Sequence, residues 1–330
     1  MGAPIIRYEA GQTAYPFESM TTSDATTFAA SFYPISSASG FEATIAPYGL
    51  LTGGAITTHV DNDKVTVAAL TAMMPAATGA AATGVLTVAA GTGTITRPAT
   101  AVAKINSITI NASGAIAVVA GTDGATTTFS ETRGAAGGPP YIPVGSIEIG
   151  QVRVISNTAA AITSAQIYTV PGLHVERSDY PVYTVEYTTG KVTFATALPL
   201  IHTAGVPKLV YIKGATPLFA PIPQTSDWVP AESTYSISST DTYDGPIGSA
   251  SASLGQASFT AVTKDGITDG FLSQRGKTIW VEFRPDRDKL LPKQLTQGIL
   301  GVSRTFPAGG GNFSASCTVT PSVQTQDVTA

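Results

Sequence analysis

The chain has 330 residues, which is enough for one large domain or two ordinary ones. Charged residues make up 12%, well below the usual share of a globular domain, whereas hydrophobic residues make up 43%, which excludes a disordered chain. The formal net charge of -4 argues against a protein that binds DNA or RNA tightly, because such binding needs clustered Lys and Arg.

Residues 1–215 are predicted to form a β-rich N-terminal domain, because alternating apolar residues recur between turns that contain Gly. The segments on either side of residues 111–114 predict one hairpin, and segment 183–194 predicts a second. Near Gly150 the apolar residues change register, which indicates a β-bulge. This part of the chain therefore favours an all-β fold, and it is long enough to be a domain of its own.

Two irregular segments follow from the Gly and Pro content. Residues 131–145 are predicted to form a long exposed loop within the N-terminal domain. Residues 216–230 contain four prolines without periodicity and are predicted to form a linker between domains. The uncharged run 65–96 imitates a membrane span, but it is rich in Ala, Thr and Gly, so we expect strands and loops there.

Residues 231–330 are predicted to form a compact β-sandwich with one short helix. Asp269 is placed to cap that helix, and an alternating strand follows it at 278–283. A hairpin then closes the chain, with two alternating strands on either side of the Gly-rich tip 307–311. Cys317 lies on the apolar face of the second strand, so we expect a buried and unreactive thiol.

No catalytic, cofactor-binding or metal-ligating pattern stands out. The three histidines, His59, His174 and His202, are scattered along the chain, without the spacing of a metal site. His174 and Glu176 share a face of an expected strand, for which a solvated polar face is the favoured interpretation over a metal site. We therefore expect no enzyme, no cofactor and no metal.

Three features follow one another in the C-terminal third of the chain. They are the short helix after Asp269 that leads into TIWVEFRPD, the hairpin GILGVSRTFPAGGGNFSASCTV, and the polar end TPSVQTQDVTA. In this order they resemble the major tail proteins, or tail-tube proteins, of long non-contractile-tailed bacteriophages (siphophages). The resemblance covers roughly residues 230–330, and its specificity comes from the order of the features.

The resemblance implies a tail-tube-like β-sandwich or barrel, and a subunit whose rings stack into the tube that conducts double-stranded DNA to the host. The chain is long enough for two such domains. We expect, narrowly, a ring of three chains with pseudo-sixfold symmetry; the alternative is six chains that each carry a decoration.

The implied partners are copies of this chain and other tail proteins, such as the tape measure, the terminator and the tail tip. DNA passes through the lumen without specific binding, and no membrane partner is expected. The implied location is the virion, after assembly in the cytoplasm of the bacterial host.

Subunit and inter-ring contacts are expected at two places near the C-terminus. The first is a charged segment, which is placed to fix the orientation of neighbouring subunits through complementary pairs. The second is the flexible glycine tip, which is placed to become ordered against the next ring. The residues are Arg284, Asp286, Arg287, Asp288 and Lys289 in the segment, and Gly309, Gly310 and Gly311 in the tip.

A second interpretation stays open, namely another β-rich virion component or a carbohydrate-binding module such as a fibre, decoration or adhesin domain. Such a module gathers exposed aromatic residues on its loops. The candidates for this role are Tyr180, Tyr183, Tyr187 and Trp228.

Overall fold

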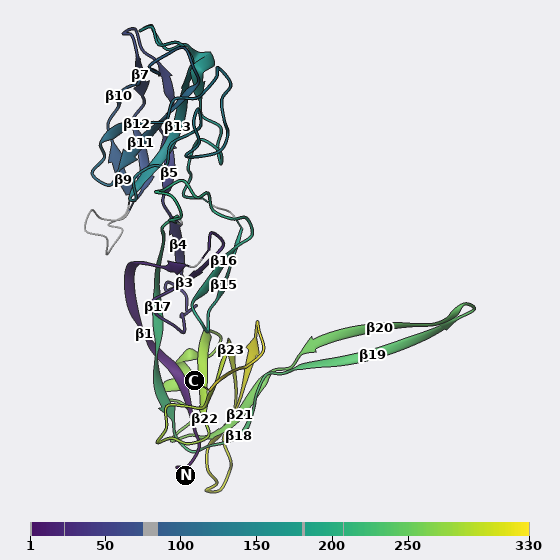
Figure 1. The fold of residues 1–330 in the computed structure, drawn as a ribbon. Helices are drawn as coiled ribbons and strands as arrows, with labels where there is room; N and C mark the ends of the chain where they lie inside the picture. The colour runs from purple at the N-terminus through teal and green to yellow at the C-terminus, as the bar shows by residue number, and fades with distance from the viewer. Residues whose placement is uncertain (1, 23, 75–84, 180–181, 207, 330) are drawn as a thin grey trace. The chain divides into compact units, whose positions relative to one another are not determined.

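The computed structural model describes residues 2–22, 24–74, 85–179, 182–206 and 208–329 (Figure 1). The predicted all-β fold is confirmed: the sheets are antiparallel, and the described residues contain helix only as two short 3-10 helices. The chain divides into two compact units, each with its own core. Unit 1 comprises Met1–Ala14, Tyr33–Ala43 and Gly214–Ala330, and unit 2 comprises Tyr15–Phe32 and Thr44–Lys213.

Unit 1 is built on a sheet with the strand order β18-β21-β24-β23-β22-β1, and β25 also pairs with β23. Next to β1 comes β17, and both of these strands continue into unit 2. The 3-10 helix η2 begins directly after Asp269, so the predicted short helix is confirmed. The elements are β1 (Ile5–Ser19), β17 (Val210–Ile222), β18 (Thr225–Val229), β19 (Ser233–Thr242), β20 (Gly245–Leu254), β21 (Ala257–Val262), η2 (Gly270–Gln274), β22 (Thr278–Arg284), β23 (Lys293–Thr305), β24 (Ser314–Pro321) and β25 (Gln326–Val328).

The core of unit 1 comes from strands that bury alternate residues. In β24, Ala315, Cys317 and Val319 face the core, and β24 pairs with β23 as the predicted closing hairpin. Burying one large apolar side chain contributes about 1.5–3 kcal/mol, so this alternation holds the hairpin in a single register. Burial also raises the pKa of the Cys317 thiol to about 12, which confirms the predicted buried thiol and keeps it protonated.

Unit 2 consists of several small antiparallel sheets around a second core. Their orders are β12-β11-β13-β14, β10-β7-β6, β5-β8-β9 and β15-β16-β3-β2, and β4 pairs with the first residues of β17. The elements are β2 (Thr21–Thr22), β3 (Thr27–Ala29), β4 (Thr44–Pro47), β5 (Gly49–Gly53), β6 (Ile56–Thr58), β7 (Lys64–Val67), β8 (Leu70–Met73), β9 (Val85–Val88), β10 (Gly91–Thr94), β11 (Lys104–Asn111), β12 (Ile116–Ala120), β13 (Ser146–Val154), η1 (Ser164–Gln166), β14 (Ile167–Tyr168), β15 (Tyr183–Glu186) and β16 (Lys191–Phe194).

The predicted hairpins of unit 2 are both present, as β11 with β12 and β15 with β16. The predicted bulge is also present: Ile108 pairs with Gly150 and Thr109 pairs with Glu148, so Ile149 is the extra residue. Strands β7 to β10 account for the described parts of the uncharged run 65–96, while residues 75–84 lie outside the described residues.

The domain division differs from the one expected at residues 1–215, 216–230 and 231–330. Unit 1 also includes Met1–Ala14 and Tyr33–Ala43, and the expected linker 216–230 forms the end of β17 and the whole of β18. The linker was predicted from prolines, two of which, Pro217 and Pro221, lie within β17. They lie beyond the residues of β17 that pair with β4, where the strand can accept proline because no ladder donor is needed on that side.

The segment 131–145 is irregular as expected, apart from a bridge at Ile142, but it is not simply exposed. Gly137, Gly138, Pro139, Pro140 and Ile142 are buried. The segment covers the polar face of β13, and a backbone without ladder bonds can be buried there because its polar groups find partners.

Candidate functional site

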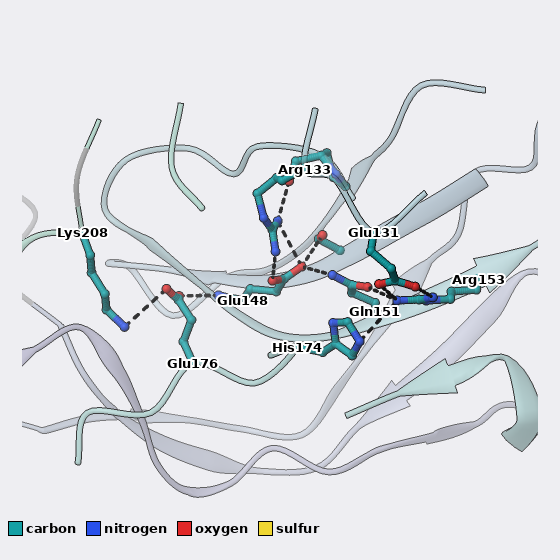
Figure 2. A network of polar contacts seen from close by, with 10 residues as sticks. Glu131, Arg133, Glu148, Gln151, Arg153, His174, Glu176 and Lys208 are labelled. Carbon is teal, nitrogen blue, oxygen red and sulfur yellow. Dashed lines mark hydrogen bonds and ion pairs between the residues drawn. The ribbon is translucent and has the colours of Figure 1, made fainter. Parts of the chain in front are cut away.

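The first candidate site is a buried polar network in unit 2, which lies on the face of β13 that points away from the apolar core (Figure 2). All nine residues of β13 are buried. Because of the bulge at Ile149, the apolar residues keep to one face, and Glu148, Gln151 and Arg153 come together on the other. A strand buried on both faces is ordinarily apolar throughout, so these polar side chains need partners.

Glu148 is the centre of one half of the network. Its carboxylate accepts hydrogen bonds from Ser107 Oγ at 2.5 Å, from Gln151 Nε2 at 3.1 Å and from Arg133 Nη2 at 2.5 Å. Arg133 comes from the segment 131–145 and also donates to the carbonyl of Pro140 at 2.5 Å. The ion pair therefore fastens this irregular segment onto the sheet.

Arg153 is the centre of the other half. It forms a two-pronged ion pair with Glu131, at 2.6 and 2.9 Å, and lies 4.2 Å above the ring of Tyr168. His174 Nε2 lies 3.3 Å from Arg153 Nη2. Burial lowers the pKa of His174, and the charge of Arg153 acts in the same direction, so His174 is a neutral ring at neutral pH.

Glu176 and Lys208 form a third, fully buried contact. Glu176 Oε1 lies 3.4 Å from Lys208 Nζ, and Glu176 Oε2 accepts a hydrogen bond from the backbone N–H of Glu148 at 2.8 Å. The side chains are 4% and 0% exposed. Burial raises the pKa of Glu176 to about 7, although Lys208 and the backbone hydrogen bond both oppose this rise.

The sequence-based interpretation of His174 and Glu176 as a solvated face was wrong, because both residues are buried in this network. The sequence does contain a signal for this network. Glu148, Gln151 and Arg153 fall on one face of a strand whose bulge was predicted. Among the residues that the structure describes, no three His, Cys, Asp or Glu side chains are grouped so that they could hold a metal ion.

The second candidate site is the charged segment of unit 1. Two of its predicted contact residues, Arg284 and Asp286, have close side-chain hydrogen bonds within the chain. Arg284 Nε donates to Glu282 at 2.7 Å, and Asp286 Oδ1 accepts from the backbone N–H of Gly2 at 2.9 Å. Arg287 donates weakly to the carbonyl of Ala3 at 3.4 Å and is exposed.

Asp288 and Lys289 of the segment are exposed as well. Lys289 lies 3.8 Å from Asp286, which is a weak pair between one exposed and one nearly buried side chain. The prediction that the segment makes subunit contacts therefore stays a prediction for Arg287, Asp288 and Lys289, whereas Arg284 and Asp286 are held by their own chain.

Arg284 belongs to a cluster around Glu282, whose side chain is 0% exposed. Arg7 Nη1, Arg284 Nε and Lys293 Nζ lie 3.1, 2.7 and 3.1 Å from its carboxylate oxygens. Burial alone would raise the pKa of Glu282, but the hydrogen bonds and charges of Arg284 and Lys293 outweigh it and lower the pKa. This carboxylate is therefore ionised at neutral pH.

The glycine tip of the closing hairpin is exposed, as expected. Gly309 and Gly310 have φ of 90° and 89°, a conformation that other residues rarely adopt, so the turn itself requires glycine at these positions. Phe306 and Phe313 meet edge to face at the base of the tip, with ring centroids 5.7 Å apart, and both are exposed. The role of Gly309, Gly310 and Gly311 in contacts between rings stays a prediction.

The third candidate site is a hairpin that the sequence analysis did not single out. Strands β19 and β20, which we call the arm, pair with each other over ten residues, and the described residues offer neither strand another pairing partner (Figure 1). Ten residues of strand span about 33 Å. Its Ser content had weakened the strand signal, because Ser is less typical of strands than Val, Ile, Thr or aromatic residues.

The two faces of the arm differ in chemistry. On one face, Tyr235 opposes Ala252 and Ile237 opposes Ala250, and the side chains of Tyr235 and Ile237 are 76% and 82% exposed. On the other face, three pairs of hydroxyl groups bond across the strands at 2.7–2.9 Å: Thr234 with Ser253, Ser236 with Ser251, and Ser238 with Ser249. Residues 233–240 and 247–254 carry no charge.

The aromatic residues proposed for carbohydrate binding are divided between the two units. Trp228 belongs to unit 1, stacks on Phe283 and donates to Gln294 Oε1 at 2.7 Å. Tyr183 and Tyr187 belong to unit 2, where Tyr183 packs against Phe194. Tyr180 lies outside the described residues.

Comparisons with protein-family models, with curated proteins and with solved structures find no match for this chain. Within the described residues, no helix has the length and apolar character needed to cross a membrane.

Proposed function

We propose that this protein is a structural subunit of a virion, and that its copies assemble into the stacked rings of a siphophage tail tube. The observation that carries the proposal is the arm. A two-stranded hairpin is marginally stable in water by itself, and this one leaves an apolar face and two strand edges uncovered. Assembly with copies of the same chain is the simplest way to cover both the apolar face and the strand edges, since identical arms have matching lengths and edges.

The faces of the arm also suit a tube that conducts DNA. In this arrangement the apolar face with Tyr235 and Ile237 packs against neighbouring subunits, and the face of paired hydroxyl groups is left for the lumen. Uncharged hydroxyl groups offer phosphates no cluster of Lys or Arg, so DNA passes without being held by counterion release. The tape measure, terminator and tail tip are the expected partners in the virion.

The organisation of the two units bears on the size of the ring. Three chains with pseudo-sixfold symmetry need two equivalent domains in each chain. Unit 1 has one broad sheet and the arm, whereas the described part of unit 2 has sheets of three or four strands. This difference favours six chains in each ring, with unit 2 as the decoration.

Electron microscopy of negatively stained protein, with light scattering on the same sample, tests the proposal. We expect rings or hollow tubes, and the mass of a ring divided by 33.7 kDa gives the number of chains. Replacing Tyr235 and Ile237 by Ser should abolish assembly, because the apolar face is lost. The matched control replaces Ser236 and Ser238 by Thr, which keeps the hydroxyl face and the strand propensity.

A chain that stays monomeric, and that does not join tubes when it is mixed with tail tips, would contradict the proposal. A charge reversal at Arg287, Asp288 and Lys289 separates the role of the charged segment from that of the arm. If that variant assembles like the wild type, these residues do not orient neighbouring subunits.

A further inference from the structure

The buried pair of Lys208 and Glu176 in unit 2 places an amine beside a carboxyl group. Nζ of Lys208 lies 3.4 Å from Oε1 of Glu176, and both side chains are almost completely shielded from water. Oε1 accepts no hydrogen bond from any described residue, while Oε2 is held by the backbone N–H of Glu148. One oxygen of the carboxyl group is therefore fixed, and the other faces the amine.

Burial favours the uncharged form of the Glu176 carboxyl group. Burial raises the pKa of Glu176 to about 7, so a large fraction is a carboxylic acid at neutral pH. A buried amine and a carboxylic acid are together less costly to desolvate than two opposite charges. The neighbouring His202 is a neutral ring at neutral pH, because burial lowers its pKa to about 4.

We propose that Lys208 and Glu176 condense into an intramolecular isopeptide bond that closes unit 2 covalently. The lone pair of Lys208 Nζ attacks Cδ of the protonated Glu176, the bond between Cδ and the hydroxyl oxygen breaks, and one proton of Nζ leaves with that hydroxyl as water. The step needs no oxidant, reductant or co-reactant. Fixing the two groups side by side replaces an encounter in solution, and the dry surroundings disfavour hydrolysis of the amide.

The bond would close a ring that runs from Glu176 through β15 and β16 to Lys208, which lies just before β17. The segment before Glu176 has few ladder bonds of its own: its backbone forms an isolated bridge between Pro171 and Val175 and a few turns. A covalent tie therefore holds a weakly structured segment against the sheet. This inference does not depend on the proposed assembly.

Unit 1 supplies an internal control. Lys293 Nζ lies 3.1 Å from Glu282 Oε2, which is closer than the pair in unit 2. Arg7 and Arg284 also bind this carboxylate, so it stays ionised, and a carboxylate anion is a poor electrophile. The protonation state of the carboxyl group, not the distance to the lysine, distinguishes the two Lys–Glu pairs. We therefore expect no bond between Lys293 and Glu282.

Mass spectrometry of the denatured full chain tests the inference. We expect the wild type about 18 Da below its sequence mass, by the loss of one water, and the Lys208→Arg variant at its full sequence mass. Trypsin should release a branched peptide in which residues 154–177 are joined to residues 192–213, because acylated Lys208 is no longer cleaved.

Peptide mapping is needed because an Asp-Gly step loses the same mass when it forms a succinimide, and this chain has such steps, for example at Asp265. Lys208→Arg keeps all of them and so controls for this loss. In Glu176→Gln, condensation would release ammonia, which predicts a loss of about 17 Da. A wild-type chain at its full mass, or an 18 Da loss that maps outside these two peptides, would overturn the inference.

Discussion

Glu282 in unit 1 and Glu176 in unit 2 are both buried carboxyl groups, and each lies beside a lysine. Glu282 has three cationic partners, so its pKa is lowered in spite of burial. Glu176 has an ion pair with Lys208 alone among the described residues, and burial raises its pKa to about 7. The comparison teaches that the number of partners, more than the depth of burial, decides whether a buried acid stays charged.

The largest effect is expected from breaking the cluster in unit 1. Glu282→Gln leaves Arg7, Arg284 and Lys293 without a carboxylate, and should destabilise unit 1 by about 3–5 kcal/mol. Tryptophan fluorescence during denaturation with urea measures it, because both tryptophans, Trp228 and Trp280, belong to unit 1. The exposed Glu42→Gln is the control, with an expected change within about 0.5 kcal/mol. Equal midpoints for the two variants would contradict the role given to the cluster.

A somewhat smaller effect is expected in unit 2 when the proposed bond cannot form. Lys208→Arg keeps the positive charge but opens the ring from Glu176 to Lys208, and a cross-link of this span stabilises by about 3–4 kcal/mol in the chain-entropy model. Hydrogen exchange at the amides of β11 and β13 reports on unit 2. Unchanged protection there, with the 18 Da difference present, would show that the bond forms without stabilising the sheet.

The pH dependence should run in opposite directions in the two units. Glu282 has a lowered pKa in the folded state, so its contribution is present above pH 4.5, the ordinary value, and is lost as the pH falls further. A free Glu176 has a raised pKa, so its contribution is present below pH 4.5 and is lost as the pH rises through about 7. The wild type should lack the second effect, because an amide does not titrate.

The experiment on Glu176 needs a reference, because His202 titrates in the same unit. Its pKa is lowered to about 4, so it removes stability as the pH falls from 6.5. The difference in the free energy of unfolding between Lys208→Arg and the double variant that also carries Glu176→Gln isolates the contribution of the carboxyl group. A difference that does not change between pH 4.5 and pH 7 would contradict the raised pKa.

The smallest effect is expected three residues from Glu176. Asp179 pairs with Arg177 on the surface, where the side chains are 58% and 49% exposed. Water screens such a pair, so Asp179→Asn should change the stability of unit 2 by less than about 0.5 kcal/mol. Hydrogen exchange at the amides of β11 and β13 compares Asp179→Asn with Lys208→Arg. If Asp179→Asn lost as much amide protection as Lys208→Arg, exposure to water would not set the energy of this ion pair.

The sequence by itself determined the local elements with strong patterns. Alternating apolar residues and Gly-containing turns predicted the hairpins β11–β12, β15–β16 and β23–β24, and the register change near Gly150 predicted the bulge. Cys317 was correctly predicted to be buried, because its neighbours on the same face are apolar. These features depend on residues close together in the chain, where the period of the pattern carries the information.

Only the tertiary structure decided which distant residues meet. Arg7 reaches Glu282 across most of the chain, and Arg133 and Glu131 bring an expected exposed loop onto β13. The placement of Glu176 beside Lys208 could not be read from the sequence, since neither residue has a local pattern that marks it as buried. A charged side chain is ordinarily assigned to the surface. Its burial becomes possible when partners offset the cost of desolvation, and these partners lie far away in the sequence, where no local pattern reveals them.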